Sequence, residues 1–322
     1  MLNSSANALT GTEYHFEGQT GLYNGKVRDV YTIRDKYIVA IATDRISAFD
    51  VVLPRPIPYK GQVLNQLAAY FLKSTKDIAS NWFTSSPDAN VSMGYKCEPF
   101  KVEIVVRGML VGHAWREYRE GKRALCGEPM PEGLHEFNLF DHPIITPSTK
   151  AESGHDEDIS AESIVQNDLA TQEELDEMRE LALKLFARGQ EMAEAKGLLL
   201  ADTKYEFGLK DGKIMLIDEI HTPDSSRYFY LDSYNDYIKG VSDQKPRHLS
   251  KEFTRNWLME NGFSGKPGQQ MPEMTEKIIK EISDRYIELY EKLTGQEFVR
   301  LEYTDITARI EKNIIKEIRS LE

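Results

Sequence analysis

Two neighbouring segments decide the architecture of this 322-residue chain: Ala201-Asp-Thr-Lys-Tyr-Glu-Phe-Gly208 and Leu216-Ile-Asp-Glu-Ile-His-Thr-Pro-Asp-Ser-Ser-Arg227. They fall in two predicted strands, residues 198–209 and 213–220, which are joined at Lys210-Asp-Gly212. A glycine-containing connection this short is typical of an antiparallel hairpin. The two segments hold the densest gathering of charged and hydroxyl side chains in the chain, so the hairpin is also where we expect chemistry.

The register of this hairpin determines which carboxylates meet. Asp202, Lys204 and Glu206 are expected on one face, because side chains alternate along a strand. A two-residue loop would turn Asp218 to the opposite face, whereas a three-residue loop with Gly212 in the left-handed conformation brings Asp218 onto the same face. We predict the three-residue loop.

Three carboxylates and one lysine on one sheet face are costly to bury unless cations or polar partners neutralise them. A hard divalent cation that bridges nucleotide phosphates is a natural partner, with Glu206 and Asp218 as its oxygen ligands. The alternative is a solvated outer face of the hairpin. Glu206 and Asp218 on opposite faces would argue against the metal site.

Outward from the hairpin, the chain reads as a mixture of helices and strands. Val and Ile alternate in short runs around the turn-like Arg34-Asp35, which predicts a second hairpin. Thr171 and Glu174 form a capping box, which predicts the start of a long helix that ends near Gly197. Further strands and helices are predicted at residues 30–33, 37–42, 102–106 and 60–73, with two amphipathic helices in the last fifty residues.

Gly25-Lys-Val-Arg-Asp-Val-Tyr31 places a glycine before two cations. Lys26 and Arg28 are two residues apart and therefore point to the same side of a strand, as in a hairpin that grips phosphate. An exposed strand with alternating charge explains the pattern equally well. The segment is not a Walker A loop, because the chain has no G-x-x-x-x-G-K-[ST] sequence.

Two more places present polar groups. The segment Thr43-Asp-Arg-Ile-Ser-Ala-Phe-Asp50 is consistent with a ligand loop that includes Ser47, or with an ordinary capped turn. Arg107 follows a buried strand and is either an anion clamp or the partner of Glu103 or Glu117.

The stretch from 145 to 157 combines hydroxyl groups with Lys150, His155 and Asp156. It predicts a loop that binds a small polar substrate, with a solvated acidic surface loop as the alternative. The seven histidines show no H-x-x-x-H spacing, which argues against a zinc site.

Composition limits the class of partner. The formal charge of -12 disfavours nucleic acid and anionic membranes as partners. Eleven acidic residues and one basic residue fall in the stretch 151–180. The rest of the chain is therefore nearly neutral and can form a local basic pocket. Cys97 and Cys126 form no disulfide framework or zinc motif. The chain shows no signal peptide and no apolar stretch near the roughly 20 residues that span a bilayer, so we expect a cytoplasmic protein.

Seven segments in order resemble the phosphoribosylaminoimidazole-succinocarboxamide synthase family, the SAICAR synthetases of purine biosynthesis. They are Gly25-Lys-Val-Arg-Asp-Val-Tyr31, Asp44-Arg-Ile-Ser-Ala-Phe-Asp50, Val105-Val-Arg-Gly108, Pro147-Ser-Thr-Lys150, Gly154-His-Asp-Glu157, Asp202-Thr-Lys-Tyr-Glu-Phe-Gly208 and the stretch from Asp218-Glu219 through Pro223-Asp-Ser-Ser-Arg227. Any one of these is weak on its own, and the order of all seven carries the resemblance.

The resemblance implies a two-lobed α+β fold related to ATP-grasp proteins and protein kinases. A β-rich N-terminal lobe, residues 1–100, would cover a larger α/β lobe, residues 101–322, with ATP between them. The implied reaction joins L-aspartate to the carboxylate of carboxyaminoimidazole ribonucleotide (CAIR) to give SAICAR, ADP and phosphate. A monomer or small homo-oligomer is expected, with small-molecule substrates only.

The resemblance also implies roles for matching residues. Gly25, Lys26 and Arg28 would lie over the ATP phosphates, and Glu206 and Asp218 would bind Mg²⁺. The expected catalytic set is Asp202, Lys204, Arg107 and Arg227, which would also hold the ribonucleotide phosphate and carboxylate. The substrate site would further include Ser47, His113, Lys150, His155 and Asp156.

One departure from the family pattern concerns His113. Many members carry a Gly-Ser pair for the nucleotide phosphate where this chain reads Gly112-His113. A histidine still donates a hydrogen bond to phosphate, and donates more strongly when it is protonated.

Two other classes of protein remain as alternatives. A kinase-like phosphotransferase would share the lobes and the carboxylates, and Glu206-Phe-Gly208 resembles its D-F-G sequence, but the chain has no H-R-D-x-x-x-x-N catalytic loop. A non-catalytic nucleotide-binding protein would not need Lys204, Glu206 and Asp218 together.

Overall fold

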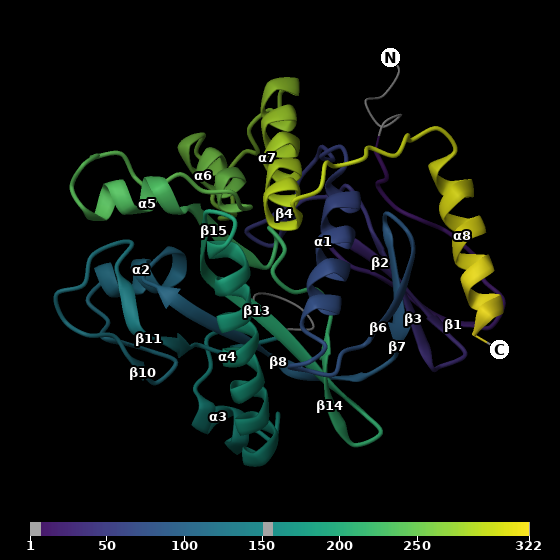
Figure 1. Ribbon diagram of the computed structural model, residues 1–322, viewed down its shortest axis with the longest axis horizontal. Helices are drawn as coiled ribbons and strands as arrows, with labels where there is room; N and C mark the ends of the chain where they lie inside the picture. Colours follow the sequence, from purple (N-terminus) through teal and green to yellow (C-terminus); the bar gives the residue numbers. More distant parts are fainter. Residues whose placement is uncertain (1–7, 151–156, 322) are drawn as a thin grey trace.

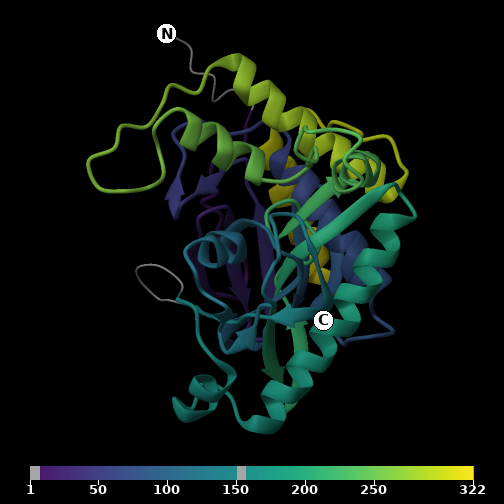
Figure 2. The ribbon, with the colours of Figure 1, turned by 90° about the vertical axis from the view of Figure 1, so that its left-hand side faces the viewer.

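The computed structural model describes residues 8–150 and 157–321. Two antiparallel sheets form its frame (Figures 1 and 2). The first sheet has the strand order β1 (Gln19–Asn24), β2 (Arg28–Ile33), β3 (Tyr37–Ala42), β7 (Val91–Tyr95) and β6 (Phe83–Asp88). The second has the order β11 (Leu139–Ile145), β8 (Glu98–Met109), β13 (Leu198–Lys210) and β14 (Lys213–Ile217), with β12 (Ser148–Thr149) beside β8 and β15 (Ser226–Tyr230) beside β13.

Helices lie on both sheets. The bounds are α1 (Lys60–Ser74), α2 (Gly112–Arg119), α3 (Ala161–Gln166), α4 (Gln172–Glu194), α5 (Leu231–Ile238), α6 (Glu252–Glu260), α7 (Glu276–Thr294) and α8 (Ile306–Ser320). Two short hairpins, β4 (Ser47–Ala48) with β5 (Val51–Val52) and β9 (Ala124–Leu125) with β10 (Glu128–Pro129), complete the described structure. In Figure 1 the first sheet lies between α1 and α8, and α4 runs along the second sheet.

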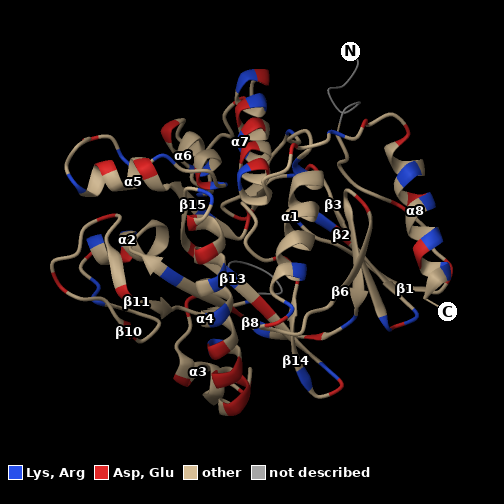
Figure 3. Ribbon diagram, viewed as in Figure 1, with Lys and Arg blue, Asp and Glu red and all other residues tan. Residues whose placement is uncertain are grey.

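Local sequence signals confirm several predicted elements. Arg34 and Asp35 both adopt positive φ angles of 53°, as a tight turn between β2 and β3 requires. The Thr171 side chain accepts a hydrogen bond from the Glu174 N–H, and the Glu174 carboxylate accepts one from the Thr171 N–H, so the predicted capping box starts α4. Acidic side chains gather at this end of α4 (Figure 3).

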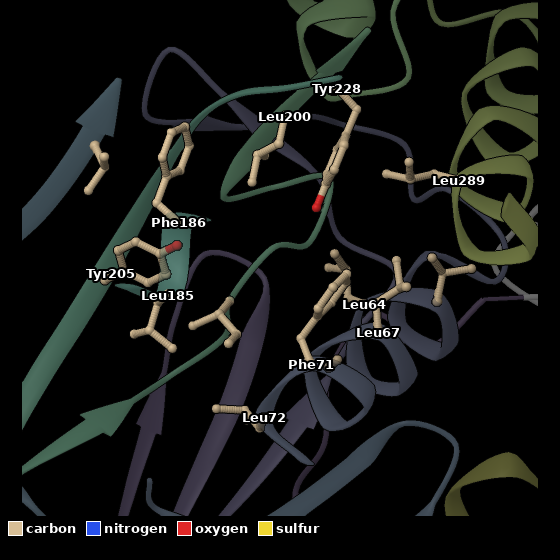
Figure 4. Close-up of a cluster of buried hydrophobic side chains, with 14 of the residues drawn as sticks. Leu64, Leu67, Phe71, Leu72, Leu185, Phe186, Leu200, Tyr205, Tyr228 and Leu289 are labelled. Atoms are coloured by element: carbon tan, nitrogen blue, oxygen red, sulfur yellow. The ribbon is translucent and has the colours of Figure 1, made fainter. Parts of the chain in front are cut away.

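One hydrophobic core joins the two sheets. Figure 4 shows Leu64, Leu67 and Phe71 of α1 facing side chains of the second sheet and of α7, among them Tyr205, Tyr228 and Leu289. These side chains are almost completely buried. Burial of this kind stabilises a side chain by about 1.5 to 3 kcal/mol relative to its exposure. Helix α1 therefore fixes the first sheet relative to the second.

The C-terminal helix returns to the N-terminal sheet. Ile310 and Ile314 of α8 are fully buried against residues of β2, β3 and β7. Arg309 and Asn313 donate hydrogen bonds to the buried Asp88 carboxylate, Arg309 over 3.0 Å and Asn313 over 2.8 Å. The division of the chain into lobes at residue 100 stays a prediction, and α8 packs on the first sheet.

The predicted register of the β13–β14 hairpin is wrong. Lys210 pairs with Lys213, so the loop holds two residues, Asp211 with φ 51° and Gly212 with φ 73°. Both conformations are left-handed, as a type I′ turn requires, and an aspartate tolerates this region better than most residues do. Glu206 consequently lies opposite Ile217.

Candidate active site

A row of charged residues crosses three adjacent strands of the second sheet. Asp202 of β13 pairs with Arg107 of β8 on one side and with Arg227 of β15 on the other. Arg107 donates to Asp202 over 3.2 Å and to the Thr146 hydroxyl over 2.7 Å, and Arg227 also donates to Asp202. Register alone therefore places two guanidinium groups around one buried carboxylate.

Arg227 is held from its other side by the start of α6. Its guanidinium donates two hydrogen bonds to Glu252, over 3.2 and 3.1 Å. Although burial lowers the pKa of Arg227, the carboxylates of Asp202 and Glu252 raise it overall. A Cβ at Gly112 would lie 2.4 Å from this guanidinium, so only glycine lets Arg227 lie against the first residue of α2.

Lys204 neutralises a second pair of carboxylates on the same sheet. Glu206 and Glu103 pair across β13 and β8, and the Lys204 ammonium lies 2.5 Å from Glu103 and 3.0 Å from Glu206. Lys150 forms an ion pair with the other oxygen of Glu206. Burial alone would raise the pKa of Glu206, but Lys204 and Lys150 lower it well below its usual range. The predicted cost of burying these carboxylates is thus met by lysines.

Asp218 joins this cluster by leaving the strand. Strand β14 ends at Ile217, and Asp218 adopts a left-handed φ of 59° while the Trp82 indole donates to its carbonyl oxygen over 2.8 Å. Burial raises the pKa of Asp218 to about 6, and the nearby charge of Glu206 adds to the rise. Asp218 thus lies beyond the strand, where the hairpin register does not assign it to a face of the sheet, and the charges of Glu206 and Lys204 both act on it. The metal site stays a prediction.

The residues present fit a divalent cation that keeps ligands from phosphates and water. The pKa of Asp218 is raised although Arg28 lies 3.5 Å away, so the cations around it do not fully balance its ionised form. Within residues 8–150 and 157–321, no group of three His, Cys, Asp or Glu side chains is arranged to hold a metal. Two protein carboxylates are the number expected where Mg²⁺ is bound together with substrate phosphates.

Arg28 connects the first sheet to these carboxylates. Its guanidinium donates to Glu219 over 2.5 Å and lies 3.5 Å from Asp218. Gly25 closes the β1–β2 turn by donating its N–H to the Arg28 carbonyl over 2.8 Å. Lys26, at the tip of the turn, is half exposed and pairs with Asp50 over 2.5 Å.

A cavity of about 500 Å³ opens beside the charged row. Five predicted residues line it: Arg107, His113, Asp202, Lys204 and Arg227. The seven other described site residues do not line it: Gly25, Lys26, Arg28, Ser47, Lys150, Glu206 and Asp218. Lys204 lines the cavity and also contacts Glu206, so it connects the cavity to the carboxylate pair.

Four predicted residues remain: His113 and Ser47, which the structure describes, and His155 and Asp156, which it does not. The His113 ring hydrogen-bonds Asp158 over 2.7 Å, and this contact lowers the pKa of Asp158. Ser47 is buried on β4. His155 and Asp156 lie outside the described residues.

Sequence reasoning missed part of the cavity wall. Arg116, Asp158, Lys251, Glu252 and Arg255 line the cavity, and none was singled out from the sequence. The two helix-start residues Lys251 and Glu252 carry no local signal, because an acidic or basic residue at the start of a helix is ordinary. Only their position beside Arg227 and Asp224 distinguishes them.

The fold and the site define a class: an α+β protein with a cation-lined cavity beside the buried carboxylates Glu103 and Glu206, suited to small polyanions. The family model described as SAICAR synthetase matches residues 21–272. The phosphoribosylaminoimidazole-succinocarboxamide synthase of Azobacteroides pseudotrichonymphae genomovar. CFP2 is 57% identical over 96% of this chain and 95% of its own length. That of Flavobacterium psychrophilum is 53% identical over 98% of this chain and 99% of its own.

Solved structures agree with these relatives. The SAICAR synthase from Saccharomyces cerevisiae complexed with SAICAR is 32% identical and superposes with a TM-score of 0.75, covering 89% of this chain and 99% of that one. A SAICAR synthetase in complex with ADP, 23% identical, shares the fold with a TM-score of 0.67, covering 87% of this chain and 100% of that one. The chain belongs to the SAICAR synthetase family, which confirms the predicted family and the α+β fold.

The sequence predicts no membrane-spanning segment, and the helices of the structure can be compared with that prediction. Among the helices of the described residues, none combines the length and the apolar character needed to cross a bilayer.

Proposed function

We propose that the cavity beside Arg107, Asp202 and Arg227 is where this family member joins L-aspartate to the carboxylate of CAIR, with ATP converted to ADP and phosphate. The observation that carries the proposal is the charged row itself. It presents two arginines, fixed by one buried carboxylate, to a cavity of a size that suits a nucleotide-like substrate. Family membership and the product-bound yeast relative support this placement.

The chemistry requires an activated carboxylate, because a carboxylate anion reacts too slowly with an amine. Transfer of the γ-phosphoryl group to the CAIR carboxylate breaks the bond to ADP and forms an acyl phosphate. The aspartate amine then attacks the acyl carbon, loses a proton and displaces phosphate. Such catalysis rests on positioning and on neutralising charge.

The chain's own cations would supply much of that neutralisation. Arg28 and Lys26, with the Gly25 turn, would lie along the ATP phosphates, and the relative solved with ADP supports a nucleotide site in this fold. Arg107, Arg227 and His113 would bind the ribonucleotide phosphate. Lys204 would bind the reacting carboxylate of the substrate, because it lines the cavity and also contacts Glu206.

Glu206 and Asp218 would hold Mg²⁺. When bound, Mg²⁺ would neutralise and orient the nucleotide phosphates. Lys150 and Lys204 now balance the charge of Glu206, and Arg28 approaches Asp218. Lys150 and Arg28 would exchange their carboxylate contacts for phosphate contacts, and Lys204 would exchange its contact with Glu206 for the reacting carboxylate.

The other expected roles are part of the same proposal. Ser47, Lys150, His155 and Asp156 would complete the substrate site. The partners are the small molecules ATP, CAIR and L-aspartate, without nucleic acid. We propose a cytoplasmic monomer or small homo-oligomer, in keeping with the free thiols of Cys97 and Cys126.

The proposal is tested by following ADP release with ATP, Mg²⁺, CAIR and L-aspartate. Release that depends on both CAIR and aspartate is expected, and Glu206→Gln should abolish it. Glu173→Gln, an exposed change on α4, is the matched control. ATP consumption that ignores aspartate and labels a peptide hydroxyl would instead support the kinase-like alternative.

A further inference from the structure

Lys251 is a cavity-lining cation whose ammonium group makes no hydrogen bond to any other residue that the structure describes. It precedes α6, and its side chain is only 13% exposed. Within the described part of the chain, its nearest carboxylate oxygen is Asp224 Oδ2, 3.8 Å away. That distance is an ion-pair contact but is too long for a hydrogen bond. All three ammonium donors therefore remain for a ligand.

Asp224 is already committed to other partners. The fully buried Lys60 donates to Asp224 Oδ2 over 2.8 Å, and the Tyr286 hydroxyl donates to Oδ1 over 2.5 Å. Lys60 and Lys251 therefore share the one carboxylate of Asp224, and of these two lysines Lys251 is the one that lines the cavity. Burial lowers the pKa of Lys251 to about 8, and Arg255 and Lys60 add to the effect against the opposing attraction of Asp224.

The other cations around the cavity differ from Lys251. Hydrogen bonds to protein carboxylates hold four of them: Arg107, Lys204, Arg227 and Arg255. Arg116 has no such bond in the described structure, but it lies among the charges of Arg227, Arg255 and Glu252. That cluster suits a doubly charged phosphate, whereas Lys251 offers one positive charge beside one negative charge.

We propose that Lys251 binds a carboxylate of the incoming L-aspartate, with Asp224 facing the amino group of the same molecule. The inference rests on the proposed ligation. Opposite charges 3.8 Å apart complement a zwitterion, and they suit a phosphate dianion poorly because Asp224 would repel it. Ser225 and Ser226 line the same part of the cavity and offer hydroxyl groups to a second carboxylate.

The test is a set of steady-state KM values for Lys251→Met and Lys251→Arg. Removing a charged hydrogen bond should raise the KM for aspartate about ten- to a hundred-fold. The KM values for ATP and CAIR should stay within about two-fold, since a selective effect reports on one substrate. Lys251→Arg keeps the charge and should recover part of the loss. Lys245→Met, an exposed lysine paired with Glu136, is the matched control.

Succinate, a dicarboxylate without the amine, gives a second readout. Its inhibition constant against aspartate should rise in Lys251→Met by about the same factor as the KM for aspartate. An unchanged KM for aspartate, or an equal rise for CAIR or ATP, would overturn the inference while leaving the ligation intact. A wild-type protein without aspartate-dependent ADP release would overturn the proposed function itself. Unaltered thermal melting and ATP KM would show that the variants fold.

Discussion

Arg107 and Asp202 are direct partners across β8 and β13, and the guanidinium donates to the carboxylate over 3.2 Å although 95 residues separate them in sequence. The same carboxylate also accepts from Arg227, a register partner on β15. Asp202 therefore fixes the spacing of two cations that would otherwise repel each other. That relationship makes Asp202 a positioning residue for the proposed phosphate site.

Asp202→Asn should weaken both folding and substrate binding. The change leaves Arg107 and Arg227 without the charge that both now contact, and breaking a buried pair costs about 3 to 5 kcal/mol. Urea unfolding should show the loss of stability, and the KM for CAIR should rise. Asp232→Asn removes an exposed ion pair with Arg247 and should change neither quantity. A stability equal to that of wild type would contradict the assigned role.

Lys204→Met should abolish turnover and also destabilise the protein. A lysine on a sheet face ordinarily contributes little to folding, but here it neutralises Glu103 and Glu206, both buried. The two carboxylates would be left with less cationic charge, so we expect a loss of about 3 kcal/mol at neutral pH. Because protonation relieves uncompensated carboxylates, the deficit should shrink as the pH falls. A deficit independent of pH would show that packing, not charge, is the cause.

Lys60→Met tests the buried network behind Lys251. Without Lys60, Tyr286 is the one hydrogen-bonding partner that the described residues leave to the Asp224 carboxylate, and we expect Lys251 to close its 3.8 Å gap to Asp224. Stability should fall by about 3 kcal/mol, because one partner of a buried pair is lost. The KM for aspartate should also rise. Lys73→Met, at the exposed end of the same helix, is the control. An unchanged KM for aspartate in Lys60→Met would show that Lys60 does not influence how Lys251 binds aspartate.

His221 should make the protein less stable in acid. Burial lowers the pKa of His221 to about 3 from its ordinary 6.5, so the unfolded chain binds the proton between these values and the folded chain does not. The contribution is complete above about pH 6.5 and falls as the pH drops, by about 2 kcal/mol at pH 5.

His221→Gln should remove this slope while keeping a polar partner for Tyr205, which now hydrogen-bonds the ring over 2.6 Å. Unfolding in urea at pH 5 and pH 7 measures the difference. His142→Gln, at an exposed position, should retain the wild-type slope. Equal slopes for wild type and His221→Gln would refute the argument.

The sequence by itself determined the elements whose signals are local. The capping box at Thr171 and Glu174 starts α4, because both partners lie within one helical turn. Arg34-Asp35 turns β2 into β3, and of these two residues the aspartate is the one that tolerates the left-handed conformation well. The ordered motifs were also sufficient to predict the family and the α+β fold, and they include all three members of the charged row.

Tertiary structure decided what depends on residues far apart in the chain. Lys210-Asp-Gly212 is compatible with a two-residue and a three-residue hairpin loop, because a shift of one residue in register suits the local sequence equally well. We predict the three-residue loop from the sequence, and the structure has the two-residue loop. Asp218 lies outside the alternation of the strand because its backbone turns left-handed after the end of β14, and the charge of Glu206 acts on it there. Lys251 carries no motif at all. It becomes a candidate ligand for aspartate because packing gives the hydrogen bonds of Asp224 to Lys60 and Tyr286 and leaves Lys251 with an ion pair of 3.8 Å to the same carboxylate.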